Sequence, residues 1–269
     1  MADTTQPTIA PSPTGPPRRY PSRIAFALGL VLTGVVLVVT IGIQNPNPPA
    51  PTAPAAAAGP PPVSPKPEPR PQPGTEAPRV GLAAPPDRPL VSDQAELDAW
   101  ATRVADKTRL DARVLAAYGR AEMWMQRQKP SCHLSWATLA AIGNLAFGTE
   151  KPGPDGTMAV NPDRAEGPDT DGGKLDGDRT ADHRVGPLRI MPAAWHKHAQ
   201  RANGDGKSAD PRNLDDAAFT AARYLCSGDD DLGAPEGWWK AMLFYNPAVN
   251  YVQDVFTAAD SYAAESVAP

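Results

Sequence analysis

Hydrophobic positions follow two different patterns along this chain. Residues 24–43 (IAFALGLVLTGVVLVVTIGI) form an apolar run of 20 residues without a charge. From residue 91 onward, apolar residues recur at intervals of three and four among polar ones, which predicts amphipathic helices. Ser92, Asp111 and Ser135 stand at N-cap positions. The predicted helices cover residues 92–108, 111–128, 135–147, 191–199, 215–226, 237–244 and 247–263.

No segment alternates well enough to predict a strand. Residues 148–184 are rich in Gly, Asp and Pro and show little regular periodicity. The sequence therefore predicts one mostly α domain over residues 91–269, with a long irregular insertion. Loops of that length are usually functional or wrongly assigned.

The apolar run at residues 24–43 has the length of a membrane span, because 20 residues at about 1.5 Å each cross about 30 Å. Arg18, Arg19 and Arg23 precede it, and no positive residue follows until Lys66. The positive-inside rule then predicts a cytoplasmic tail at residues 1–23, one transmembrane helix and an extracytoplasmic remainder. The alternative is a signal peptide cleaved near residues 53–58. Signal h-regions are shorter, about 7–15 residues, so the anchor is favoured.

A Pro/Ala-rich stretch follows the apolar run at residues 44–90. It holds 17 of the 34 prolines of the chain, all between Pro46 and Pro89. Proline fixes φ and lacks a backbone donor, so such a segment favours extended polyproline II. At about 3.1 Å per residue it would reach about 140 Å. We expect a linker that holds the domain away from the membrane.

Charge and cysteine content narrow the function classes. The net charge is −4 and the pI about 5.6, so no basic balance argues for nucleic acid. There is no CxxC spacing, and the four histidines are scattered, so we expect no metal site built on them and no cofactor. In an exported domain, Cys132 and Cys226 are expected to form a disulfide. Closing so long a loop would contribute about 4–5 kcal/mol in the chain-entropy model.

Four segments, in order, resemble the lytic transglycosylase family of the membrane-bound, actinobacterial type. CHLSWATLAAIGNLAFGTE (132–150) is similar to the family helix LPW-T-LLAAIG-x-V-E-S, and the segment 169–195 contains VGPLRIMPAAW where the family has AVGPMQFLPGTW. Residues 203–226 and 244–255 resemble the two elements that follow. The resemblance covers about residues 110–262. It implies a lysozyme-like, mostly α fold whose substrate is the glycan strand of peptidoglycan.

The resemblance also implies a catalytic residue that this chain lacks. The family uses one glutamate as acid and then base, at the end of the IG-x-V-E-S motif. Here that position is Ala146, followed by Phe147. Losing a general acid costs about 10²–10⁴-fold in rate. Glu150 could stand in if the helix continued, since it lies four residues further, but Gly148 argues that the helix ends first.

Other positions of the family's glycan groove are kept or changed. Gly186 and Pro187 match the family, whereas Arg189 replaces the glutamine of its GPMQ motif. A guanidinium would depress the pKa of a nearby carboxyl, or it could bind a substrate carboxylate or peptide group; an ordinary surface arginine is the alternative. Tyr245 and Asn246 match the family's YN pair, expected to line the cleft, with core packing as the alternative.

Three weaker features complete the candidates. Glu166 lies in the irregular stretch and could fold over the cleft, whereas Glu122 has helical spacing and is expected at the surface or behind the site. The run 203–206 (NGDG) resembles the centre of a calcium loop. Arg201 and Arg212 then occupy positions one and twelve, where acids are needed, so a simple Asx/Gly turn is the favoured interpretation.

Two functions remain open on the sequence alone. The first is a peptidoglycan-binding pseudoenzyme that keeps the glycan groove and recruits or regulates cell-wall enzymes. The second is an active transglycosylase that forms a 1,6-anhydro product with a displaced carboxylate such as Glu150. Because function must be argued from the site rather than from the fold, the missing glutamate favours the first.

Overall fold

The structure, a computed structural model, describes residues 70–83, 94–148, 150–158 and 165–268. In these ranges the chain is mostly α, as predicted, and β pairing is limited to isolated bridges. The elements are α2 (Gln94–Thr108), α3 (Ala112–Gln128), η1 (Pro130–Cys132), α4 (Trp136–Phe147), α5 (Pro192–His198), α6 (Leu214–Leu225), α7 (Pro235–Tyr245) and α8 (Val249–Val267).

Side-chain caps fix where several helices begin. The Asp111 carboxylate accepts the N–H groups of Arg113 and Val114, and the Ser135 hydroxyl accepts that of Ala137. Both caps confirm the sequence prediction. Helix α6 begins slightly earlier than predicted, because the Asn213 side chain caps it by accepting two N–H groups of its first turn. Ser92 lies outside the described residues.

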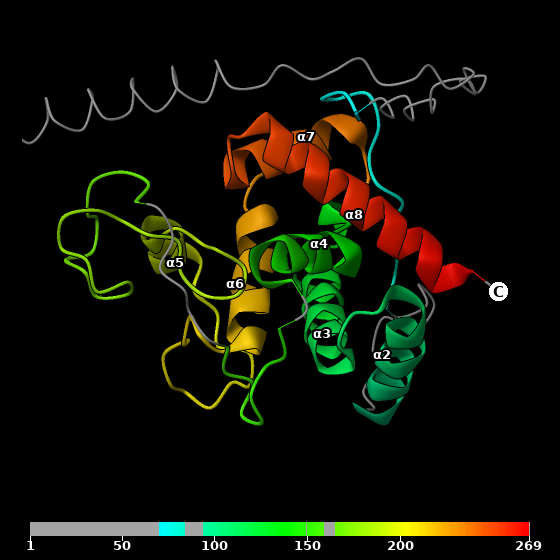
Figure 1. The fold of residues 1–269 in the computed structure, drawn as a ribbon, viewed down its shortest axis with the longest axis horizontal. Coiled ribbons are helices and arrows are strands. Elements are labelled where there is room, and N and C mark those ends of the chain that lie inside the picture. Colours follow the sequence, from blue (N-terminus) through cyan, green and yellow to red (C-terminus); the bar gives the residue numbers. More distant parts are fainter. Residues whose placement is uncertain (1–69, 84–93, 149, 159–164, 269) are drawn as a thin grey trace, which may run out of the picture. The chain divides into compact units, whose positions relative to one another are not determined.

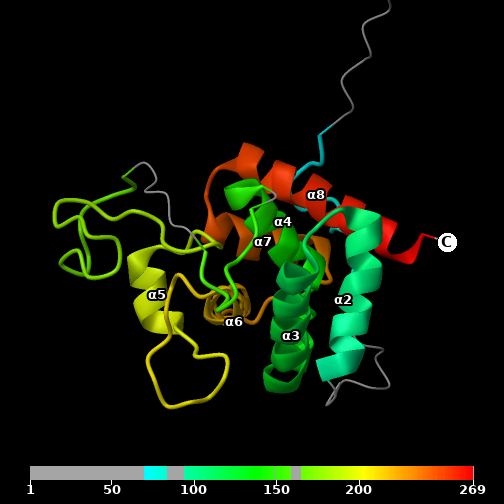
Figure 2. The same ribbon diagram turned by 60° about the horizontal axis from the view of Figure 1, so that its bottom comes forward.

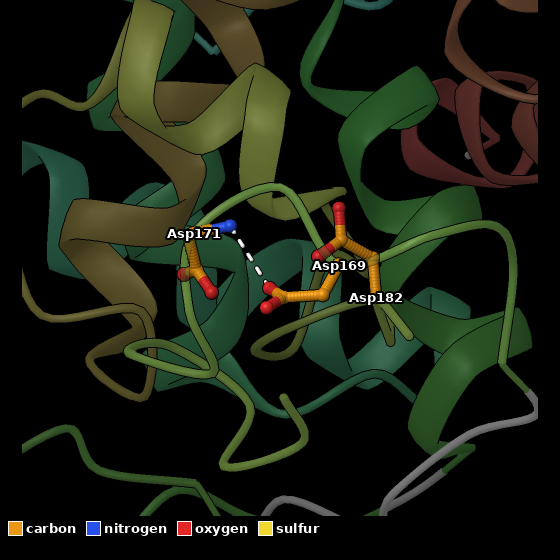
Figure 3. A group of neighbouring side chains, drawn as sticks. All are labelled: Asp169, Asp171 and Asp182. Atoms are coloured by element: carbon orange, nitrogen blue, oxygen red, sulfur yellow. Dashed lines mark hydrogen bonds between the residues drawn. The ribbon is translucent and has the colours of Figure 1, made fainter. Parts of the chain in front are cut away.

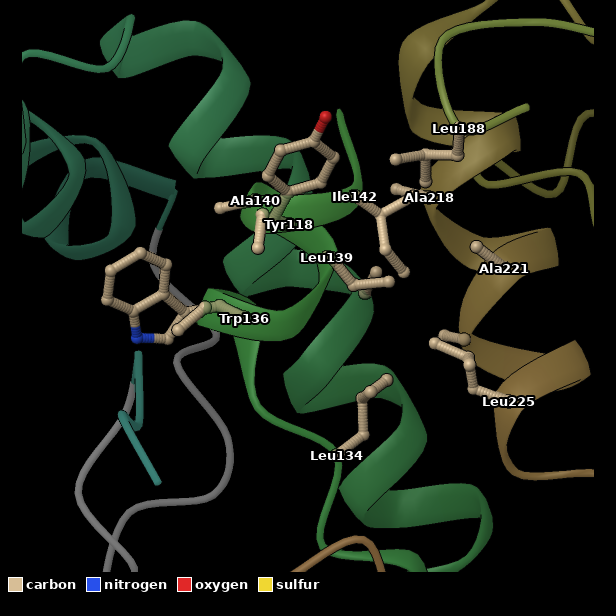
Figure 4. Close-up of a cluster of buried hydrophobic side chains, with 14 of the residues drawn as sticks. Tyr118, Leu134, Trp136, Leu139, Ala140, Ile142, Leu188, Ala218, Ala221 and Leu225 are labelled. Carbon is tan, nitrogen blue, oxygen red and sulfur yellow. The ribbon is translucent and has the colours of Figure 1, made fainter. Parts of the chain in front are cut away.

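Helix α4 forms the centre of the core. Every residue from Trp136 to Gly143 is buried, and α4 packs against α3, α6 and α8 (Figures 1 and 2). Figure 4 shows Leu139 and Ile142 of α4 between α3 and the α6 side chains Ala218, Ala221 and Leu225. Helix α5 packs against α6.

A disulfide joins Cys132 and Cys226, which confirms the expected pairing. It links η1, just before α4, to the C-terminal end of α6. The backbone reinforces this junction, because the N–H of Leu232 donates to the carbonyl of Cys132 at 2.8 Å. The bond therefore fixes the start of the central helix to the helix that it packs against.

The folded part begins earlier than the sequence suggested. Residues 70–83, which we call the strap, were expected to belong to the linker at residues 44–90, yet they lie along the helical domain. Gln253 of α8 donates to the carbonyl of Pro71 at 2.9 Å, and the indole of Trp239 donates to that of Glu76 at 2.8 Å. The N–H of Arg79 donates to Asp260 at 2.9 Å.

The end of the strap reaches the core. Gly81 exchanges two hydrogen bonds with the Ser135 hydroxyl, at 3.2 and 2.8 Å. Ala83 is buried, and its N–H donates to the Glu122 carboxyl at 3.1 Å. A proline-rich chain has few donors to satisfy, so it can lie extended on a helical surface and bond through its carbonyls. The strap is thus part of the domain.

None of the helices in the described ranges is both long and apolar enough to cross a membrane. The predicted transmembrane helix at residues 24–43, the basic tail and most of the linker lie outside the described residues.

We predict that the strap is needed for stability. A chain that begins at residue 84 should unfold at least about 5 °C below one that begins at residue 70, because buried groups that lose a partner cost about 1–3 kcal/mol each. Thermal unfolding followed by circular dichroism measures the difference. As a control, chains that begin at residues 66 and 70 should melt together; equal melting of the chain from residue 84 would contradict the docking.

Candidate functional site

The last turn of α4 leaves the core at Ala146 and Phe147, which are both half-buried. The helix ends at Phe147, and Gly148 follows with a φ of 60° and donates its N–H to Asn144 at 2.7 Å. Glu150 is exposed and lies beyond this cap. It is therefore not on the helical face of Ala146, as the sequence argument from Gly148 anticipated.

Residues 185–190 form a tight turn that we call the 185–190 turn. Val185 and Ile190 exchange two backbone hydrogen bonds, of 2.8 and 3.0 Å, and both are buried. Gly186 has a φ of 68°, and a Cβ atom there would lie 2.0 Å from the carbonyl oxygen of Pro211. Only glycine fits that combination of positive φ and close approach. The turn therefore packs closely against the 210–212 segment at Gly186.

Arg189 lies over Phe147. Its guanidinium carbon is 5.3 Å from the centroid of the phenyl ring, which is a cation–π distance. Two positions that the motif comparison singled out are therefore in contact. The structure brings together these two positions, which are 42 residues apart in the sequence.

A second arginine, Arg184, organises the same region. Its side chain is buried, its Nε lies 2.9 Å from both carboxylate oxygens of Glu166, and its Nη1 donates to the carbonyls of Arg189 and Tyr245 at 3.0 and 3.3 Å. Burial works against the charge, but the Glu166 hydrogen bond and charge outweigh it and raise the pKa of Arg184. Glu166 is thereby committed to an ion pair.

Tyr251 of α8 faces the same charges and was not singled out by the sequence. Burial raises its pKa to about 12, against the opposing charges of Arg184 and Arg189. It lies in the 244–255 segment, but that comparison singled out only Tyr245 and Asn246.

Tyr245 and Asn246, the YN pair, lie at the end of α7, where Tyr245 contacts the 185–190 turn. Tyr245 is only 2% exposed, and its hydroxyl donates to the carbonyl of Leu188 in the 185–190 turn. Asn246 caps the end of α7 and accepts the N–H of Ala248 at 3.0 Å. Tyr245 occupies the core position that was the alternative to a cleft role, and it fixes the turn through its hydroxyl.

A cavity of about 300 Å³ opens beside the end of α4. We call it the α3–α4 cavity; among the residues that line it are Tyr118, Gly143, Phe147, Glu150 and Pro187. Gly143 allows the Tyr118 hydroxyl to approach α4, because a Cβ there would lie 2.1 Å from it. Three residues proposed from the sequence, namely Phe147, Glu150 and Pro187, therefore meet at one cavity.

The other carboxylate of the α3–α4 cavity is already engaged. Asp111 lines the cavity but accepts two N–H groups as the cap of α3, and its second oxygen lies 3.6 Å from the ammonium group of Lys151. Such a cap fixes the carboxylate to the helix terminus. Glu150 thus remains the carboxylate of this cavity that has no capping role.

Glu122 is fully buried, at 0% exposure, which contradicts the surface position that was one of its two expected placements. Its carboxyl accepts the N–H of Trp136 at 2.8 Å and that of Ala83 at 3.1 Å. Burial raises its pKa to about 8, although these hydrogen bonds lower it. Glu122 joins the strap to the start of α4, and it lines none of the described cavities.

In the loop around residues 203–206, which resembles the centre of a calcium loop, the Arg201 guanidinium occupies the centre of the acidic groups. The Arg201 guanidinium donates to both oxygens of Asp205, at 2.9 and 2.8 Å, and to Asp216 at 2.7 Å. These contacts hold the pKa of Asp205 well below its usual range. The arginine at the first loop position bonds the acids that a calcium ion would need, so the loop is built as an arginine-centred turn.

A further acidic group lies in the insertion (Figure 3). Oxygens of Asp169, Asp171 and Asp182 lie within 4.8 Å of one another, a spacing that could hold a cation. However, each carboxylate already accepts donors of the same loop. Asp169 accepts three consecutive N–H groups, Asp171 accepts two, and Asp182 accepts the N–H and hydroxyl of Thr170. The three carboxylates therefore hold the backbone of the insertion in place through these hydrogen bonds.

No family model matches this chain, and no curated protein or solved structure matches it either. The resemblance to lytic transglycosylases therefore depends on the quoted motifs.

The raised pKa of Glu122 predicts a pH dependence of stability. Its folded-state pKa of about 8 exceeds its ordinary value of 4.5, so its contribution is complete below pH 4.5 and is lost as pH rises to about 8. The slope is at most one proton, or about 1.4 kcal/mol per pH unit. Urea unfolding between pH 5 and 9 measures it.

The Glu122→Gln variant is the matched control, because it keeps the shape and cannot ionise. Its free energy of unfolding should vary less with pH than that of the unsubstituted chain, whatever its absolute stability. Parallel pH profiles for the two proteins would show that Glu122 is ionised in the folded state throughout.

Proposed function

We propose that this protein binds the glycan strands of peptidoglycan through a lysozyme-like, lytic transglycosylase-like domain and does not cleave them. The observation that carries the proposal is Ala146 at the end of α4, where the resembled family has its acid/base glutamate. The groove elements expected around that position, Phe147 and Pro187, meet at the α3–α4 cavity.

Glycosidic cleavage needs a proton donor placed within hydrogen-bond reach of the leaving oxygen. An alanine methyl group cannot supply it. Glu166 is held in an ion pair by Arg184, and Glu122 is buried away from the cavities. These assignments favour binding without turnover.

Arg189 adds a second obstacle to catalysis. A carboxylate introduced beside it would be stabilised in its ionised form, whereas a general acid must hold its proton until the transition state. The same guanidinium offers planar donors that suit the amide and carboxylate groups of a muropeptide. Arg189, stacked on Phe147, is thus better suited to a binding role.

The N-terminal apolar run and the disulfide together indicate a location for the protein. We propose a cell-membrane protein with a cytoplasmic N-terminus, one transmembrane helix at residues 24–43 and an extracytoplasmic domain. The Cys132–Cys226 disulfide supports export, because such bonds persist in oxidising compartments. A domain held on a linker could reach the wall and present bound glycan to cell-wall enzymes.

One observation favours the alternative of an active transglycosylase. Glu150 lines the same cavity as Phe147 and Pro187, and it is exposed. A movement of the segment after Gly148 would bring this carboxylate towards a bound glycan. We therefore include Glu150 in the test.

The proposal predicts binding without product. The unsubstituted chain should sediment with purified sacculi and release little soluble anhydro-muropeptide. Ala146→Glu combined with Arg189→Gln should raise product release by about 10² or more, the lower end of the contribution of a general acid. Pull-down and chromatography of the soluble fraction measure both properties.

Ala146→Gln with Arg189→Gln is the matched control, since it adds the same bulk without a proton donor and should release no product. Glu150→Gln should leave binding unchanged. Turnover by the unsubstituted chain that Glu150→Gln abolishes would instead establish the active enzyme, and a failure to bind sacculi would refute a glycan groove.

A further inference from the structure

A second cavity, of about 490 Å³, opens beside the 185–190 turn. We call it the basic cavity; the residues that line it include Lys174, His183, Arg184, Gly186, Asp210 and Arg212. Pro187, the residue that follows Gly186 in the turn, lines the α3–α4 cavity. Because consecutive Cα atoms lie about 3.8 Å apart, the walls of the two cavities meet at this turn.

The cations of the basic cavity are not neutralised equally. Lys174 is exposed and forms no ion pair with any residue that the structure describes. Arg212 is largely exposed and lies 3.6 Å from Asp210, which is a long and solvent-screened pair. Arg184 is buried and paired with Glu166. Lys174 and Arg212 are therefore available to a ligand.

The acids of the same cavity have structural roles. Both oxygens of Asp176 accept backbone N–H groups, those of Asp178 and His183, at 3.0 and 2.7 Å. Asp210 accepts the N–H of Arg212 at 2.9 Å. Arg184 is neutralised by Glu166, so Lys174 and Arg212 face two carboxylates that keep their charge. The cavity is thus close to neutral overall, and this balance suits a singly charged carboxylate better than a multiply charged phosphate.

The remaining wall is apolar. Leu175, Val185 and Pro211 line the cavity beside the charged groups. A ligand that fits must combine a carboxylate with small apolar side chains, which describes a short peptide better than a bare sugar. Small-ligand sites commonly have this mixture of apolar walls and a few placed charges.

We propose that the basic cavity binds a carboxylate of the stem peptide attached to the glycan strand, with Lys174 and Arg212 as its ligands. This inference rests on the proposed function, because the glycan in the α3–α4 cavity delivers the peptide across the 185–190 turn. Arg184 supports the arrangement, since its Nη1 bonds the backbone of both the turn and the end of α7.

The test compares three soluble ligands on the full-length chain: glycan chains with stem peptides, the same chains stripped of peptides by an amidase and with the lactyl carboxylates that this hydrolysis frees then amidated, and chains whose peptide carboxylates are amidated. The peptide-bearing chains should bind about tenfold more tightly than the other two, as expected for one charge-assisted carboxylate site. Isothermal titration calorimetry measures the dissociation constants.

The Lys174→Ala/Arg212→Ala variant should bind all three ligands alike, at the affinity of the stripped chains. Lys197→Ala/Arg127→Ala is the matched control: it removes one lysine and one arginine, both exposed and outside the basic cavity, and should retain the preference. The amidated ligand keeps the test decisive even if the first variant folds poorly, because it uses the unsubstituted protein.

The outcomes separate this inference from the proposed function. Equal binding of peptide-bearing, stripped and amidated chains by the unsubstituted protein would overturn the carboxylate site and leave the glycan groove standing. A preference for peptide-bearing chains that survives in the Lys174→Ala/Arg212→Ala variant would overturn the assignment to this cavity. Binding to none of the three would overturn both proposals.

Discussion

The complete burial of the first two turns of α4 is the constraint on which the other elements of the domain depend. A helix without a solvent-facing side must be covered on all sides, and α3, α6 and α8 do so. The polar groups at its start must also be satisfied within the protein. The Ser135 hydroxyl and the Glu122 carboxyl accept the N–H groups there, and the strap closes over them.

The same constraint determines where chemistry can take place. Because α4 is buried up to Gly143, it reaches solvent only in its last turn, where Leu145 is exposed and Ala146 and Phe147 are half-buried. Phe147 combines a rigid helical position with access to the α3–α4 cavity, which is what a binding side chain requires, whereas Ala146 is not among the residues that line it. Because Ala146 lies outside the fully buried turns, a substitution there would alter this end of the helix at little cost to the core.

Arginines fill several polar roles in the described part of the chain. Arg184 neutralises Glu166 and bonds two backbone carbonyls, Arg189 stacks on Phe147, and Arg201 joins Asp205 to Asp216. A guanidinium has five donors in a fixed plane, so one side chain can hold several segments together. These arginines are therefore held by fixed contacts within the protein.

The sequence by itself determined the helices and the cysteine pairing. Periodicity and the caps Asp111 and Ser135 placed α3 and α4 closely, because these signals act within one or two turns. Gly148 likewise showed that α4 ends before Glu150. The candidate positions Phe147 and Arg189 came from motifs, whereas their contact came from the structure.

Only the tertiary structure decided which polar residues are buried and what they bond. Glu122 was expected at the surface or behind the site, yet it is fully buried and accepts the N–H of Ala83, 39 residues away. The strap resembles an extended linker in composition and docks because side chains of the packed helices donate to its carbonyls and accept its N–H groups. Composition and periodicity report local preference, whereas these hydrogen bonds depend on groups that only the packed helices bring together.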